Sequence, residues 1–268
     1  MHAMKERDAR EKRIISWPAG TAMLSALAVI LLFTGCSEHP GLVAYRQRDY
    51  AGSLREFRAG NDPMGIFAIG LMYYKGEGVI RDPQQAAVWF RRAAEMGHAG
   101  AQYNLGLLNL NGEGVAKDYR EASRWFGLAA DQDIVRAQLN LGLMYAKGDG
   151  VTKDLQQTLH WFRLAAGQGS TKAQVFLGEM YFRGEGVVRD RSEAVRWFRM
   201  AGEQGSIEAQ IYLGVSYLRG QGVKKDREEA AAWFRKAAAQ GSDQAEQFLE
   251  QMIAKKGTNP EISKLSGR

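Results

Sequence analysis

A pair of large aromatic residues recurs along the chain at a fixed interval. Each Trp-Phe dipeptide lies 36 residues after the one before it, at Trp89-Phe90, Trp125-Phe126, Trp161-Phe162, Trp197-Phe198 and Trp233-Phe234. A Gly-x-Gly-Val motif recurs in the same register and begins at Gly76, Gly112, Gly148, Gly184 and Gly220. One such unit cannot bury its own apolar face and must stack on copies of itself, so five repeats without an insertion predict a solenoid.

The residues around each Trp-Phe pair predict an amphipathic helix. Small and apolar side chains at Ala86, Trp89, Phe90, Ala93 and Ala94 follow the i, i+3, i+4 spacing of one helix face. The later repeats keep this stripe. We therefore expect a structural role in the core, rather than ligand binding, for the five tryptophans: Trp89, Trp125, Trp161, Trp197 and Trp233.

An aspartate marks the start of each of these helices. The five are Asp82, Asp118, Asp154, Asp190 and Asp226, and each is followed three residues later by Gln or Glu. This spacing is typical of an N-cap with a reciprocal capping-box partner. Pro83 occupies the first helical position, where its missing N–H costs nothing.

The segment before each Gly-x-Gly motif predicts a second helix in every unit. Leu-Gly pairs such as Leu105-Gly106 follow a small residue, Ala101, four positions earlier, which lets two helices approach closely. We expect Gly76 to end this helix with a positive φ angle and Gly78 to turn the chain. A phosphate-binding loop is disfavoured, because the motif joins two helices and no Lys-Ser/Thr follows it.

These positions together resemble a known repeat. The unit Ala-Gln-x-x-Leu-Gly-x-x-Tyr-x-x-Gly-x-Gly-Val-x-x-Asp, followed by Ala-x-x-Trp-Phe-x-x-Ala-Ala-x-x-Gly, is similar to the Sel-1-like repeat, a longer relative of the tetratricopeptide repeat. It is nearly complete at 173–205 and 209–241, and the match covers about residues 61–253. The resemblance implies an all-α fold, namely a right-handed α-solenoid of antiparallel helix pairs built from 36-residue Sel-1-like or TPR-like repeats.

The N-terminal segment predicts export and membrane attachment. Residues 5–13 are charged with a basic excess, and residues 19–33 form an apolar run, as in a signal peptide. The run ends in Phe33-Thr34-Gly35-Cys36, which resembles the bacterial lipobox and implies cleavage before Cys36 and lipidation of its sulfur. Phe33 departs from the usual Leu. The alternative is an uncleaved transmembrane anchor, although the run is short of the roughly 20 residues that span a bilayer.

The expected order of segments follows from these patterns. Residues 1–35 form the lipoprotein signal peptide, 36–60 the lipidated N-terminus with a degenerate half-repeat cap, 61–240 five repeats, 241–253 a C-terminal capping helix and 254–268 a disordered tail. Because Ser37 rather than Asp follows the cysteine, the lipobox resemblance implies an outer membrane lipoprotein that faces the periplasm. Display on the cell surface stays open as an alternative.

The composition of the chain limits the kinds of binding or catalytic site that we expect. With one cysteine and four histidines far apart in the chain, an intramolecular disulfide is impossible and a metal site is not expected. The formal charge of +6 is spread along the chain, whereas nucleic-acid binding needs a concentrated basic face. We expect no cofactor, no small-molecule substrate and no catalytic residue, since repeated positions argue for structure.

The resemblance implies that the first helices line a concave face that binds other proteins. Apolar residues there would include Tyr103 and Phe182, beside a row that precedes the glycine loops: Lys75, Asn111, Lys147, Arg183 and Arg219. Four of these five residues are basic, which would suit an extended protein segment with acidic groups. The alternative is that the row only complements the negative C-terminal ends of the first helices.

Three functional classes follow. The first is a membrane-anchored, non-catalytic scaffold for protein–protein interaction in the bacterial cell envelope. The second is a surface-exposed lipoprotein that binds host proteins, or a periplasmic regulator of a sensor. The third is a β-lactamase-like enzyme, which some disulfide-rich relatives are thought to be; this chain has no cysteine pairs and no Ser-x-x-Lys motif in its repeats.

Overall fold

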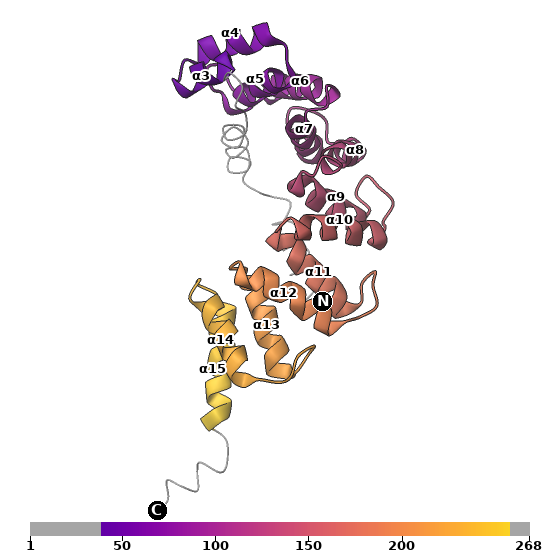
Figure 1. Ribbon diagram of the computed structural model, residues 1–268, viewed down its shortest axis with the longest axis vertical. Helices are drawn as coiled ribbons and strands as arrows, with labels where there is room; N and C mark the ends of the chain where they lie inside the picture. The colour runs from indigo at the N-terminus through magenta and orange to yellow at the C-terminus, as the bar shows by residue number, and fades with distance from the viewer. Residues whose placement is uncertain (1–38, 258–268) are drawn as a thin grey trace, which may run out of the picture. The chain divides into compact units, whose positions relative to one another are not determined.

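The structure is a computed structural model that describes residues 39–257, and this part of the chain is helical without strands (Figure 1). Its helices are α3 (Pro40–Arg46), α4 (Tyr50–Gly60), α5 (Pro63–Lys75), α6 (Pro83–Glu95), α7 (Ala99–Asn111), α8 (Tyr119–Ala130), α9 (Val135–Lys147), α10 (Leu155–Gly167), α11 (Thr171–Arg183), α12 (Arg191–Glu203), α13 (Ile207–Arg219), α14 (Arg227–Ala238) and α15 (Asp243–Gly257). The predicted all-α solenoid of helix pairs is confirmed. Within residues 39–257, no helix is long and apolar enough to cross a membrane.

The helices pack in sequential pairs inside two compact units, which divide between Asp118 and Tyr119. In the first unit α3 packs on α4 and α5 on α6, and α7 packs on α6. In the second unit the pairs are α9 with α10, α11 with α12 and α13 with α14, and each pair packs on the helix that follows it. The second helices α6, α10, α12 and α14 therefore each join their own repeat to the next helix.

The aspartates cap the second helices by a different network from the one predicted. Asp82 Oδ1 accepts the backbone N–H groups of Gln84 and Gln85 at 2.9 and 3.0 Å, and Asp154, Asp190 and Asp226 act in the same way. The predicted reciprocal bond, from the backbone N–H of the aspartate to the Gln or Glu side chain three residues later, is wrong. The N–H of Asp82 donates instead to the carbonyl of Tyr73 at 2.9 Å, and this bond closes the Gly-x-Gly loop in each repeat.

The first glycine of each loop takes the left-handed conformation, as predicted, with φ of 78° at Gly76; the second does so too, with φ of 74° at Gly78. The second glycine has a further role that the sequence did not reveal. A Cβ atom on Gly222 would lie 2.1 Å from the carbonyl oxygen of Arg191, at the start of the preceding second helix. A Cβ atom on Gly150 would lie equally close to the carbonyl oxygen of Tyr119. The absence of a side chain therefore lets each loop press against the neighbouring repeat.

Phenylalanine, more than tryptophan, fills the centre of each repeat. The Phe of every Trp-Phe pair is almost completely buried: Phe90, Phe126, Phe162, Phe198 and Phe234. In the second unit the ring of Phe198 stacks on Tyr212 of the next repeat, with centroids 4.4 Å apart. Trp125 and Trp233 are 2% and 4% exposed. The other three tryptophans are half-buried: Trp89, Trp161 and Trp197.

A row of buried glutamines connects the repeats of the second unit. Gln174 Nε2 donates to the carbonyl of Ala166 at 3.2 Å, and its Oε1 accepts from Gln204 Nε2 at 3.0 Å. The same bonds recur around Gln138 and Gln210. Each glutamine satisfies a carbonyl near the end of its neighbouring second helix, so these buried amides are structural.

Additional helices flank the repeats at both ends. The expected half-repeat in 36–60 contains α4, which Asp49 caps, and the short helix α3 packs on it. The expected capping helix in 241–253 is α15, which continues to Gly257. Its polar residues face solvent: Gln244, Gln247, Glu250 and Gln251. The predicted signal peptide, Cys36 and most of the predicted tail lie outside the described residues.

Candidate interaction surfaces

The predicted cationic row lies at the C-terminal ends of the first helices, but carboxylates lie beside it. Lys75 Nζ is 3.9 Å from Glu77 Oε1. Arg183 pairs with Glu179 at 3.3 Å and with Glu185 at 3.6 Å. Glu77 and Glu185 belong to the Gly-x-Gly loops, so the loops partly neutralise the row. Lys147 is half-buried and Arg219 is exposed at the equivalent positions.

The apolar residues that we predicted on the concave face offer little free surface. Tyr103 is 8% exposed, so it lies in the core of its unit rather than on an accessible face. Phe182 is half-buried, and its ring centroid lies 6.5 Å from those of Phe198 and Tyr212. Both residues therefore contribute mainly to packing, which the helical register alone could not distinguish from exposure.

Two tyrosines of the first helices donate hydrogen bonds to carboxylates. Tyr212 donates its hydroxyl hydrogen to Glu179, and Tyr74 donates to Glu113 at 2.9 Å. Burial, reinforced by the bond to Glu113, raises the pKa of Tyr74 to about 12. Burial and Glu179 also raise the pKa of Tyr212. Both phenols remain protonated donors at neutral pH and hold these carboxylates in place.

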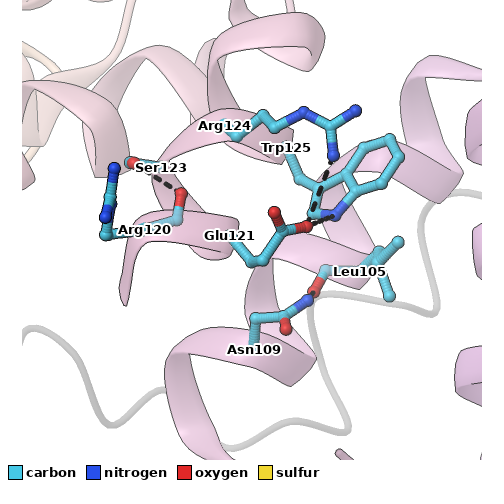
Figure 2. A network of polar contacts seen from close by, with 7 residues as sticks. All are labelled: Leu105, Asn109, Arg120, Glu121, Ser123, Arg124 and Trp125. Carbon is cyan, nitrogen blue, oxygen red and sulfur yellow. Dashed lines mark hydrogen bonds and ion pairs between the residues drawn. The ribbon is translucent and has the colours of Figure 1, made fainter. Parts of the chain in front are cut away.

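A second set of tyrosines accepts hydrogen bonds from arginines of the preceding second helix. Arg163 Nη2 donates to Tyr181 Oη at 2.6 Å, and Arg199 donates to Tyr217 in the next repeat. These two arginines therefore connect adjacent helices. Where the repeat has Asn109 instead of tyrosine, its amide donates within its own helix to the carbonyl of Leu105 at 2.8 Å (Figure 2).

The third residue of some second helices binds the repeat tryptophan. Figure 2 shows Glu121 on α8 between two side chains of its own helix: Oε2 accepts from Trp125 Nε1 at 3.1 Å and pairs with Arg124 at 3.4 Å. Glu229 accepts from Trp233 Nε1 at 3.0 Å. The residue predicted as a capping-box partner thus orients the indole ring.

A second basic row, which the sequence reasoning missed, lies at the loop edge. The residue before every capping aspartate is basic and exposed: Arg81, Lys117, Lys153, Arg189 and Lys225. The β-carbon of Arg189 lies 3.0 Å from where a Cβ on Gly184 would be, so the side-chain stem lies over the left-handed glycine. In the described part of the second unit, Lys153, Arg189 and Lys225 form no ion pair. The 36-residue period was the signal that could have found this row.

One loop of the second unit borders an open cleft of about 1230 Å³. Leu159 and Arg163 of α10, Tyr181 of α11, loop residues 187–190 and Arg191 at the start of α12 line it. Val188 lies at its rim and is 90% exposed. The cleft combines an exposed apolar side chain with three arginines.

Comparisons with known proteins agree with the repeat geometry. The Sel1 repeat model matches residues 63–98, 99–134, 135–170, 171–206 and 207–242. A Sel1 repeat protein from Oxalobacter formigenes is 33% identical with a TM-score of 0.74, over 78% of this chain and 87% of that one. No protein with a curated description matches the chain significantly.

A second solved structure is similar over more of this chain. It is c5321, a protective antigen present in uropathogenic Escherichia coli strains that displays an SLR fold. It is 32% identical with a TM-score of 0.77 over 82% of this chain, which spans about half (49%) of the length of c5321. With five matched repeats and two similar structures, the chain belongs to the Sel1 repeat family.

Proposed function

We propose that this protein is a non-catalytic scaffold that binds other proteins and is held at a membrane of the bacterial cell envelope. Proteins built from Sel1 repeats are typically scaffolds for protein–protein interaction. The observation that carries the proposal is that each repeat has two kinds of position, those that are the same in every copy and those that differ. Caps, glycines and core phenylalanines stay the same, while exposed loop and helix positions differ between copies. Stacked repeats of this kind present extended surfaces for partners.

The aligned acidic residues support a structural role. The capping aspartates Asp82, Asp154, Asp190 and Asp226 accept backbone N–H groups. Glu179 and Glu193 pair with arginines. An active site needs different residues in different roles, whereas the capping aspartates repeat one role from repeat to repeat.

The N-terminal residues support the anchoring part of the proposal. The apolar run that ends at Phe33-Thr34-Gly35-Cys36 matches a lipoprotein signal except for Phe33. Several acyl chains on Cys36 would hold the protein stably, because each buried methylene contributes about 0.8 kcal/mol. With Ser37 next in the chain, we place the protein on the outer membrane, facing the periplasm.

Crosslinking in cells tests the scaffold. A C-terminally tagged chain is crosslinked, purified and analysed by mass spectrometry, with Cys36→Ala as the matched variant. We expect a reproducible protein partner, and we expect Cys36→Ala to leave the membrane fraction and change its electrophoretic mobility. If Cys36→Ala stays in the membrane with unchanged mobility, the lipid anchor is wrong. If only monomer is recovered across crosslinkers of several lengths, the scaffold is wrong.

Display on the cell surface is the second candidate. It is favoured by the similarity to c5321, which is described as a protective antigen. Protease treatment of intact cells separates the two locations. Cleavage of the repeats without permeabilisation would place the scaffold outside, and resistance until the outer membrane is opened would place it in the periplasm.

A further inference from the structure

The cleft of the second unit differs from the corresponding surface of its neighbours. We name it the α10–α11 cleft and define it by Leu159, Arg163, Tyr181, Val188, Arg189 and Arg191. At the position of Val188 the neighbouring loops have Thr152 and Lys224. Arg163 is replaced by Gly127 in α8 and recurs as Arg199 in α12, so of these two residues Val188 is the one that differs from both neighbours. Positions that depart from the repeat are the ones that can distinguish a partner.

Two of its arginines are held in place before any partner binds. Arg163 is fixed by its bond to Tyr181 at 2.6 Å. The guanidinium carbon of Arg191 lies 5.5 Å from the centre of the Phe182 ring, and its Nε atom is buried. Guanidinium groups ordered in advance lose little entropy when they bind a carboxylate.

The cleft also carries a surplus of positive charge. Arg189 is exposed and, among residues 39–257, forms no ion pair. Asp190 is the one carboxylate that lines the cleft, and its Oδ1 caps α12. The flanking Glu185 and Glu193 pair with Arg183 and Arg196, respectively.

We propose that the α10–α11 cleft binds an acidic segment of a protein partner. Carboxylates of the segment pair with Arg163, Arg189 and Arg191, and one of its apolar side chains packs on Val188. This inference rests on the proposed scaffold function and specifies the surface and the chemistry of the partner. It places recognition at the loop edge, where the cations are not matched by neighbouring carboxylates.

The first unit contains an internal comparison. Ile80 occupies the position of Val188 and is also 90% exposed. There, however, Arg81 pairs with Glu113 at 2.5 Å, and Pro83 stands at the position of Arg191. Arg58, which donates to Tyr73 at 3.3 Å, corresponds to Arg163 there. An acidic segment therefore finds an exposed apolar residue with fewer available cations, and we expect this loop to bind it less tightly.

Fluorescence anisotropy with synthetic peptides tests the proposal on the full chain in detergent. The probe is a fluorescein-labelled peptide of Asp, Leu, Gly and Ser. One control peptide has Asn for Asp, and another has Ser for Leu. We expect the probe to bind at least tenfold more tightly than either control. Arg189→Glu and Val188→Thr should each weaken binding at least fivefold, whereas the matched changes Lys225→Glu and Ile80→Thr should stay within twofold.

Several results would overturn the assignment. If Arg189→Glu and Lys225→Glu weaken binding of the probe equally, the peptide is attracted by the positive charge of the protein in general and not by this cleft. Loss of binding only in a Lys147→Gln, Arg219→Gln variant would place the site on the first helices. Absence of probe binding would also refute the cleft, while the scaffold is judged separately by crosslinking in cells. Circular dichroism melts verify that each variant is folded, and Arg189→Gln provides a milder second variant.

Discussion

His98 caps α7 with an imidazole nitrogen, at the position where the next repeat has Ile134 and the repeats after it have serine. Its Nδ1 accepts the backbone N–H of Ala101 at 3.1 Å, and its ring stacks on Phe67 with centroids 4.4 Å apart. Burial lowers the pKa of His98 below 6.5, although its own backbone hydrogen bond and Asp62 act in the opposite direction. The fold therefore requires the neutral ring, because a protonated Nδ1 cannot accept a hydrogen bond.

We predict that acid weakens this cap. Between the lowered pKa of the folded chain and about 6.5, the unfolded chain binds more protons, so the stabilisation is complete above about pH 6.5 and is lost as the pH falls. His98→Ser, which introduces the residue that Ser170 and Ser206 provide in later repeats, should reduce this dependence. Urea denaturation at about pH 7.5 and 5.5 measures it; an equal drop for parent and variant would show that His98 is not responsible.

The indole N–H of Trp161 lacks a hydrogen bond of the kind that the tryptophans of two other repeats form. Among residues 39–257 its buried Nε1 finds no acceptor, whereas Trp125 and Trp233 donate to a glutamate four residues earlier. We predict that Gln157→Glu supplies the acceptor and raises the free energy of unfolding by about 0.5–1.5 kcal/mol. The same change in a Trp161→Phe background is the control. If the gain is identical there, it comes from the helix dipole and not from the indole.

At the scale of elements, each Gly-x-Gly loop joins a helix end to the neighbouring repeat. Gly222 combines a φ of 77° with an approach that leaves no room for a Cβ, only 2.1 Å from Arg191 O. Gly205 also has a positive φ, 92°, yet nothing lies within 4 Å of its would-be Cβ. Substitution of these two glycines therefore separates the cost of the backbone conformation from the cost of close packing.

We predict that Gly205→Ala costs about 1–2 kcal/mol, the penalty for placing an L side chain in the left-handed region. Gly222→Ala should cost clearly more, because Arg191 and the start of α12 must also move. Thermal melts of the two variants make the comparison. Equal losses would mean that the loop does not constrain the stacking of repeats.

At the scale of the whole molecule, the buried glutamines make adjacent repeats depend on each other. We predict that Gln174→Leu lowers the free energy of unfolding by about 1–3 kcal/mol, because it leaves the Ala166 carbonyl and the Gln204 amide without a partner. Since each repeat is stabilised by its neighbours, hydrogen exchange should quicken from α10 through α13. Gln84→Leu, at an exposed site, is the control and should leave exchange unchanged.

The 36-residue pattern alone predicted the elements of this fold. Asp226 and Gly220 were correctly predicted to begin and end helices, because backbone geometry imposes the same need in every copy. The Phe of each Trp-Phe pair lies in the core for a similar reason: the period of the helix decides which face is apolar. Family membership followed from the same residues.

Contacts between copies were decided only by the tertiary structure. The close approach of Gly222 to Arg191 and the bond between Gln204 and Gln174 join residues about 30 positions apart, where no local rule applies. Helical register placed Tyr103 on the accessible face, yet packing buries it. The charge row changed for a more local reason: Glu185 lies two residues after Arg183, and the fold of the glycine loop brings it beside the helix end, where it neutralises Arg183. Periodicity determines which positions are equivalent, and the packing of neighbours determines which of them stay free to bind.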